Sequence, residues 1–134
     1  MRNRVPKRLL DAGMTIERYM SLKWACREYD KMRAVLAGMR DPLRATTYGG
    51  DAGHSGTGDP TVQAVERLMR TPEFQRVMAI THAAIVTDAE LYHGILENVC
   101  RGKAYWEIQP RPWCGERQFY AKCVSFFLEL DKFL

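Results

Sequence analysis

The last third of the chain decides the fold, and residues 87–134 read TDAELYHGILENVCRGKAYWEIQPRPWCGERQFYAKCVSFFLELDKFL. Apolar residues recur at helical spacing through Asp88–Arg101, and Gly102 follows where a left-handed helix cap would lie. A short second helix fits Ala104–Ile108, because the two prolines that follow cannot continue a helical hydrogen-bond ladder. A longer helix fits Glu116–Phe133. This order of helix, tight turn and longer helix predicts a C-terminal helix-turn-helix, a motif that places side chains in the major groove of DNA.

The predicted last helix has an apolar face and a polar face, and Gly115 is an acceptable N-cap for it. On a helical wheel, the side chains expected in the core are Phe119, Cys123, Phe126, Phe127 and Leu130. The residues expected largely on the opposite face are Arg117, Tyr120, Ala121, Val124 and Leu128. Arg117 and Gln118 occupy the opening turn, where an arginine can chelate guanine and a glutamine can chelate adenine. We therefore predict that these two residues read base edges.

Four further residues are predicted to contact DNA phosphates, and they are Lys103, Arg111, Tyr120 and Lys122. Residues 101–122 carry a local charge of +3, which suits a modest phosphate footprint. An alternative interpretation remains open, in which Arg117 and Gln118 are only solvated residues at the start of a helix.

Helical patterns along the chain and the lack of a confident strand pattern predict an all-α protein. A length of 134 residues, of which 46% are hydrophobic, corresponds to about one domain. No apolar run approaches the roughly 18 residues of a membrane span, and the basic start leads into no signal-peptide core. We therefore expect a protein of the cytoplasm that does not enter a membrane. The net charge is +4, and residues 1–44 hold 11 basic and 5 acidic side chains. The excess positive charge thus lies near the N-terminus rather than in the predicted helix-turn-helix.

The first helix is predicted to be long, running from a Thr15 cap to a stop at about Gly38. The basic lead before it, residues 1–13, is expected to be either loose or a short helix over Lys7–Ala12. Its apolar seam consists of Tyr19, Leu22, Cys26, Tyr29 and Leu36. We expect this seam to pack within its own domain, and pairing of two copies into a homodimer is the alternative.

The chain divides into four predicted parts. These are a basic arm with the long amphipathic helix (1–47), a glycine-rich flexible loop (48–58), middle helices (59–86) and the helix-turn-helix (87–134). The loop lacks the Gly-Lys-Ser/Thr ending of a phosphate-binding loop, so a linker is favoured. Three helix starts are expected, at Asp59-Pro60, at Thr71-Pro72 and at Thr87.

No pattern of residues indicates catalysis or a cofactor. His54 lies in the loop, and His82 and His93 lie on predicted helices without a paired nucleophile. A zinc site built from His93 and three cysteines is disfavoured, because no Cys-x-x-Cys knuckle is present. The four cysteines, Cys26, Cys100, Cys114 and Cys123, are expected to be reduced thiols. We therefore predict no enzyme activity, no metal and no cofactor.

Two short motifs, Gly115–Tyr120 (GERQFY) and Phe126–Leu130 (FFLEL), resemble the end of small phage regulators of the RinA/ArpU type. Upstream, Tyr105–Ile108 (YWEI) is similar to the second-helix signature of these regulators, and the glycine-rich loop ending in Asp59-Pro60-Thr61 matches their layout. The resemblance covers the chain from about Tyr19. Its DNA-reading part is similar to the fourth region of bacterial sigma factors.

The resemblance implies a phage-encoded transcriptional regulator, an activator of late genes, in the cytoplasm of a bacterial host. Double-stranded DNA near a promoter would be its partner, with host RNA polymerase as a second partner to be considered. Two alternatives stay open. One is a phage assembly or packaging factor such as a small terminase subunit, and the other is a polymerase-binding protein without DNA contact.

Overall fold

The computed structural model describes the backbone of residues 4–49 and 60–134, and this part of the chain is helical without strands. The helices are α1 (Lys7–Asp11), α2 (Ile16–Arg27), α3 (Tyr29–Gly49), α4 (Pro60–Met69), α5 (Pro72–Thr87), α6 (Tyr92–Arg101) and α7 (Glu116–Phe133), with a short 3-10 turn, η1 (Tyr105–Glu107). The predicted all-α class is therefore confirmed. None of these helices is long and apolar enough to cross a membrane. The predicted glycine-rich loop falls almost wholly outside the described residues.

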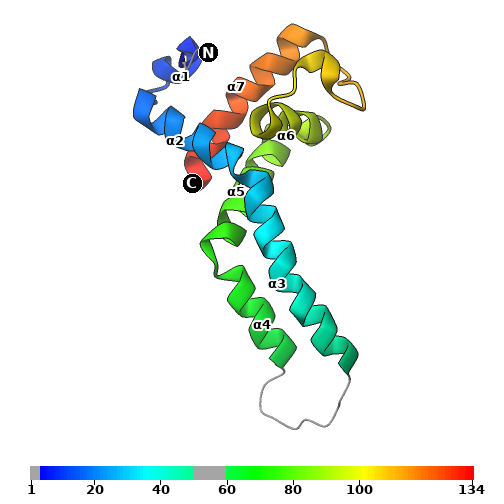
Figure 1. Ribbon diagram of the computed structural model, residues 1–134. Helices are drawn as coiled ribbons and strands as arrows, with labels where there is room; N and C mark the ends of the chain where they lie inside the picture. Colours follow the sequence, from blue (N-terminus) through cyan, green and yellow to red (C-terminus); the bar gives the residue numbers. More distant parts are fainter. Residues whose placement is uncertain (1–3, 50–59) are drawn as a thin grey trace.

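The helices form a body and an arm (Figure 1). α5 lies at the centre, where it packs against α7, α6 and α3, while α2 packs against α6 and α7. α3 and α4 run side by side away from the body as a two-helix arm, and α5 continues the direction of α4 back into the body. The largest fully buried side chains of the body include Phe119, Phe126, Ile80 and Ile95. The position of α7 is thus fixed by a core to which several helices contribute.

Three predicted helix boundaries are confirmed by local hydrogen bonds or backbone angles. The Thr15 hydroxyl accepts a hydrogen bond from the Arg18 amide at 3.1 Å, and the Thr71 hydroxyl accepts one from the Phe74 amide at 3.2 Å. Each threonine satisfies an amide that has no partner inside its helix. Gly102 ends α6 with φ 72°, a left-handed conformation that glycine adopts at little cost.

The predicted long N-terminal helix is wrong, because it is interrupted at Glu28. α2 ends there and α3 begins one residue later, and α3 continues past Gly38 instead of stopping. The break lets α2 lie against α6 and α7 while α3 follows α5. The predicted apolar seam is buried on both sides of the break, with its members Tyr19, Leu22, Cys26, Tyr29 and Leu36 in the interior. This seam therefore packs within its own chain.

The predicted helix-turn-helix is altered in two places. Thr87 is the last residue of α5, where its hydroxyl donates to the Ala83 carbonyl at 2.7 Å, and it does not start the next helix. Asp88 caps the following turn instead, because its carboxylate accepts hydrogen bonds from the Glu90 and Leu91 amides at 2.9 and 3.0 Å. The predicted second helix, Ala104–Ile108, shrinks to η1. Residues 102–115 therefore form a broad connection rather than a tight turn.

Candidate nucleic-acid interface

The orientation of α7 follows the predicted pattern of apolar and polar residues. Its aromatic face is inside the protein, with Phe119 and Phe126 fully buried and Phe127 nearly so. Arg117 and Gln118, on the opening turn, are exposed. The first turn of α7 is therefore accessible to a ligand, while its aromatic side chains anchor it from behind.

The connection before α7 holds that orientation through close contacts. A Cβ added at Gly94 of α6 would lie 3.4 Å from both Ile108 and Phe119, so the absence of a side chain lets these two residues pack against α6. The Tyr105 hydroxyl donates to the Cys114 carbonyl at 2.7 Å, and the Tyr105 amide donates to the Tyr120 hydroxyl at 2.9 Å. Both bonds tie η1 to the start of α7.

The structure separates the six predicted DNA-contacting residues into two groups. Arg117, Gln118 and Arg111 are exposed, and Arg111 lines a small pocket against the start of α6 together with Trp113. The other three have partners within the protein. Tyr120 accepts the hydrogen bond from Tyr105.

The remaining two predicted contacts, Lys122 and Lys103, are in ion pairs. The Lys122 ammonium lies 3.2 Å from an Asp88 carboxylate oxygen. Burial raises the pKa of the Asp88 carboxyl, but the hydrogen bonds from Leu91, Lys122 and Glu90 outweigh it, and the pKa lies below its ordinary value. Lys103 is paired with Glu97, as described next. Sequence patterns could not reveal the pairing of Lys122 with Asp88, because these residues are 34 positions apart and only the fold brings them together.

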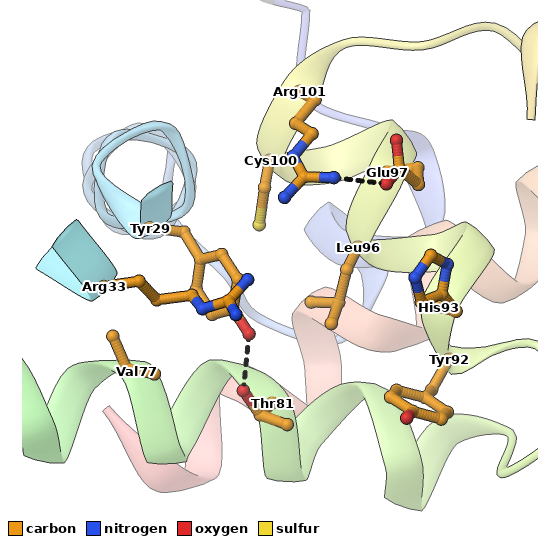
Figure 2. A pocket seen from close by; sticks show the side chains of 10 residues that line it. All are labelled: Tyr29, Arg33, Val77, Thr81, Tyr92, His93, Leu96, Glu97, Cys100 and Arg101. Atoms are coloured by element: carbon orange, nitrogen blue, oxygen red, sulfur yellow. Dashed lines mark hydrogen bonds and ion pairs between the residues drawn. The ribbon is translucent and has the colours of Figure 1, made fainter. Parts of the chain in front are cut away.

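Four charged residues between α3 and α6 neutralise one another, and we name Asp30, Glu97, Arg101 and Lys103 the acid-paired cluster. Arg101 donates to both carboxylate oxygens of Asp30, at 2.8 and 3.0 Å, and it also donates to Glu97. The Lys103 ammonium lies 2.9 Å from the other Glu97 oxygen, at ion-pair distance but without hydrogen-bond geometry. Figure 2 shows Arg101 turned toward Glu97 at the edge of a pocket.

The pairing within the acid-paired cluster shifts the pKa values of Glu97, Asp30 and Arg101. Lys103, followed by Arg101, holds the pKa of the buried Glu97 carboxyl below its ordinary value against the opposing effect of burial. The hydrogen bonds from Arg101 likewise lower the pKa of Asp30, and Asp30 raises the pKa of Arg101 in return. The basic side chains of the cluster are thus already paired with acids of the same protein.

The pocket beside this cluster has a volume of about 350 Å³ and lies between α3, α5 and α6 (Figure 2). On one wall, the Tyr29 and Thr81 hydroxyls are 2.8 Å apart and share a hydrogen bond. The Arg33 guanidinium lies 5.7 Å from the centre of the Tyr29 ring, within the range of a cation–π contact. The hydrogen bond between Tyr29 and Thr81 joins the start of the arm to α5 of the body, whereas the Arg33 contact lies within α3.

α1 lies against α7, a contact that the sequence did not predict. One Arg8 nitrogen donates to the Ala121 carbonyl at 3.2 Å, and another donates to the Ser125 hydroxyl at 2.6 Å. Val124 and Leu128, which we expected largely opposite the core, are half-buried and pack against the core cluster to which Val5, Leu9 and Met14 belong. The only sequence signal for this contact was the basic charge excess of the N-terminal region, which does not specify where that region docks.

We name the row formed by Arg117, Ala121 and Ser125, together with Arg8 of α1, the α7 ridge. Residues four apart on a helix lie one above the other, so Arg117, Ala121 and Ser125 form one line along α7. In the described part of the chain, neither Arg8 nor Arg117 lies within ion-pair distance of an acidic side chain. The α7 ridge is therefore positively charged, unlike the acid-paired cluster.

Two exposed tryptophans in the connection before α7 were also missed by the sequence analysis. Trp106 is 70% exposed and Trp113 is 58% exposed. Large exposed aromatic side chains are unusual away from binding surfaces. No local sequence pattern marked these two side chains as exposed, since Ile108 and Cys114 in the same connection are buried.

The four cysteines are free and buried. A hydrogen bond with Cys100, together with burial, raises the pKa of the Cys26 thiol, and burial raises the pKa of Cys123 to about 12. Within residues 4–49 and 60–134, no three histidine, cysteine or acidic side chains are grouped so as to hold a metal ion.

Comparison with known proteins adds no relative: no protein-family model, no curated protein and no solved structure matches this chain.

Proposed function

We propose that the protein is a phage-encoded transcriptional regulator, an activator of late genes, that binds promoter-region DNA through the opening turn of α7. It acts without catalysis and without a cofactor, in the cytoplasm of a bacterial host. The single observation that carries the proposal is the exposed pair Arg117 and Gln118 on a helix whose opposite face is anchored in the core. The motif resemblance to RinA/ArpU-type regulators falls on this same segment.

The chemistry of the two residues supports the proposal. Arginine and glutamine are the side chains that make bidentate contacts with guanine and adenine in the major groove. They project from the first turn of a helix of 18 residues, which is the part of a recognition helix that reaches deepest into the groove. Lys103 and Lys122 contribute less than the sequence suggested, because their charges are already paired. The expected phosphate footprint of the helix-turn-helix region is correspondingly small.

The proposal is tested by measuring binding of the full chain to duplex DNA from the promoter region upstream of late genes in the genome that encodes it, with a random duplex as competitor. Replacing Arg117 by Ala should weaken binding to the preferred duplex by about 1–3 kcal/mol and leave binding to random DNA nearly unchanged. Arg67→Ala is the matched control, because Arg67 is an exposed arginine on α4 of the arm. Equal affinity of all three proteins for both duplexes would refute the assignment.

A second candidate function is a polymerase-binding protein that makes no contact with DNA. The observation that favours it is the exposure of Trp106 and Trp113, since tryptophan is enriched at the centres of protein interfaces. Trp113→Ala separates the two functions: it should weaken binding to host RNA polymerase, whereas Arg117→Ala should weaken binding to DNA.

A homodimer or a larger packaging assembly would have to use surfaces other than the first-helix seam, because that seam is buried within the chain. One such surface is formed by exposed apolar residues of the arm, namely Val35, Met39, Val62, Val65 and Met69. A ring in solution would favour a small terminase subunit, and a monomer or dimer would favour the regulator.

A further inference from the structure

α1 is a short helix that is firmly docked. Leu9 is fully buried, and Val5 and Met14 on either side of α1 are nearly so. The Gly13 amide donates to the Leu10 carbonyl and the Met14 amide donates to the Leu9 carbonyl, and these two hydrogen bonds end the helix. Gly13 has a φ of 93°, a left-handed conformation that allows the chain to turn away there. The backbone of α1 is therefore held in place beside α7 (Figure 1).

Arg8 keeps its positive charge available although both of its hydrogen bonds are internal. Its acceptors, a backbone carbonyl and a hydroxyl, are uncharged. Arg18 of α2 is different, because its guanidinium lies 2.5 Å from the Asp131 carboxylate at the other end of α7. A guanidinium held by neutral acceptors remains an attractive site for an anion, since arginine has five N–H donors and stays protonated.

The position of Arg8 along α7 matches the dimensions of a DNA groove. Ala121 and Ser125 are four and eight residues beyond Arg117, which corresponds to about 6 and 12 Å along a helix axis. The major groove is about 12 Å wide, so a cation at this distance from a base-reading turn is within reach of the phosphates beside the groove. Lys7, the preceding residue of α1, is also exposed and supplies a second cation on this short helix.

Accordingly, we propose that α1 is a second DNA-contacting element, in which Arg8 and Lys7 bind phosphates that flank the bases read by α7. This inference rests on the proposed function and extends it to the N-terminal basic region, where most of the excess positive charge of the chain lies. These contacts are independent of base sequence, because phosphates carry no sequence information. They would supply the nonspecific affinity that the paired Lys103 and Lys122 do not.

The test is the dependence of DNA affinity on salt concentration for the full chain and for three variants, Lys7→Gln, Arg8→Gln and Arg8→Lys. Each lost phosphate contact should reduce the slope of log affinity against log salt by about 0.9. We expect this reduction for Lys7→Gln and Arg8→Gln, with equal weakening on preferred and random duplexes. Arg8→Lys should retain the slope, because it retains the charge.

The matched control is Arg67→Gln on α4, which removes the same charge from the arm and should leave the slope as it is in the unmodified chain. Helix content and unfolding temperature of each variant identify any loss of fold. If the unmodified chain and Arg117→Ala differ in specific binding but Lys7→Gln and Arg8→Gln keep the original slope, the inference is overturned and the proposed function stands. If the unmodified chain fails to bind duplex DNA at low salt, both are overturned.

Discussion

The acid-paired cluster and the α7 ridge contain the same kinds of basic side chains and use them in opposite ways. In the cluster, Arg101 and Lys103 are paired with Asp30 and Glu97 and join α3 to α6. On the ridge, Arg8 bonds only to neutral acceptors, and the described residues place no acid within ion-pair distance of Arg117. The comparison teaches that a count of basic residues does not measure the charge available to a ligand.

This difference has a consequence for both stability and binding. Charge that is paired inside the protein contributes to the free energy of folding and little to attraction of an anion. Unpaired charge on a rigid surface contributes little to the free energy of folding. It contributes to binding, because it attracts phosphates and releases counterions on binding. Variants in the cluster should therefore change stability, and variants on the ridge should change DNA affinity.

The largest expected effect on stability comes from removing a buried aromatic ring on the face of α7 that packs in the core. Phe119→Ala should lower the free energy of unfolding by about 3–5 kcal/mol, because a fully buried ring leaves a cavity behind α7. Trp106→Ala, which removes an exposed aromatic side chain, should change it by less than about 0.5 kcal/mol. Urea denaturation of both variants measures the difference. Similar losses for the two would show that α7 is not anchored by this face.

The acid-paired cluster should give the next largest effect. Glu97→Gln should lower the free energy of unfolding at pH 7 by about 1–3 kcal/mol, because it removes the buried negative charge that attracts Arg101 and Lys103. The folded-state pKa of Glu97 lies below the ordinary value of 4.5. Its stabilising contribution is thus present above that pH and is lost as pH falls through the lowered pKa. The difference in the free energy of unfolding between the parent protein and Glu97→Gln should therefore become smaller below about pH 4.5.

Urea denaturation at a series of pH values measures this narrowing. Glu66→Gln on α4 is the control, because Glu66 is an exposed acid on the arm. If the free energies of unfolding of Glu97→Gln and its parent differ by the same amount from pH 7 to pH 3, the charge of Glu97 does not stabilise the fold.

The smallest effect on stability should come from the ridge. Arg117→Ala should change the free energy of unfolding by less than about 0.5 kcal/mol, because the side chain is exposed at the start of α7. The same unfolding measurement tests this expectation. A loss comparable with that of Glu97→Gln would mean that Arg117 supports the fold rather than a ligand.

Local patterns in the sequence predicted the starts of α2 and α5, the end of α6 and the buried face of α7, although they placed one helix start wrongly at Thr87. Thr15, Thr71 and Gly102 act on their own turns, so their neighbours in sequence contain the needed information. The spacing of Phe119 and Phe126 likewise defines one side of a helix before any partner is known. All-helical structure and the inward aromatic face followed from such signals.

Contacts between distant segments could not be predicted in this way. The pairing of Arg8 with Ala121 joins residues 113 positions apart, and the pairing of Arg101 with Asp30 joins residues 71 apart. The predicted first helix is interrupted at Glu28, and no glycine or proline at this position marks the break in the sequence. The η1 turn replaced a predicted helix because its five-residue segment offered few hydrogen bonds of its own.

The most direct test of the central claim is a map of backbone amide shifts in the nuclear magnetic resonance spectrum as duplex promoter DNA is added to the full chain at low salt. The account predicts that the largest shifts occur at Arg117, Gln118 and Ala121 and extend to Arg8, while Val65 on the arm remains unchanged. Shifts confined to the arm, or absent from the opening turn of α7, would contradict it.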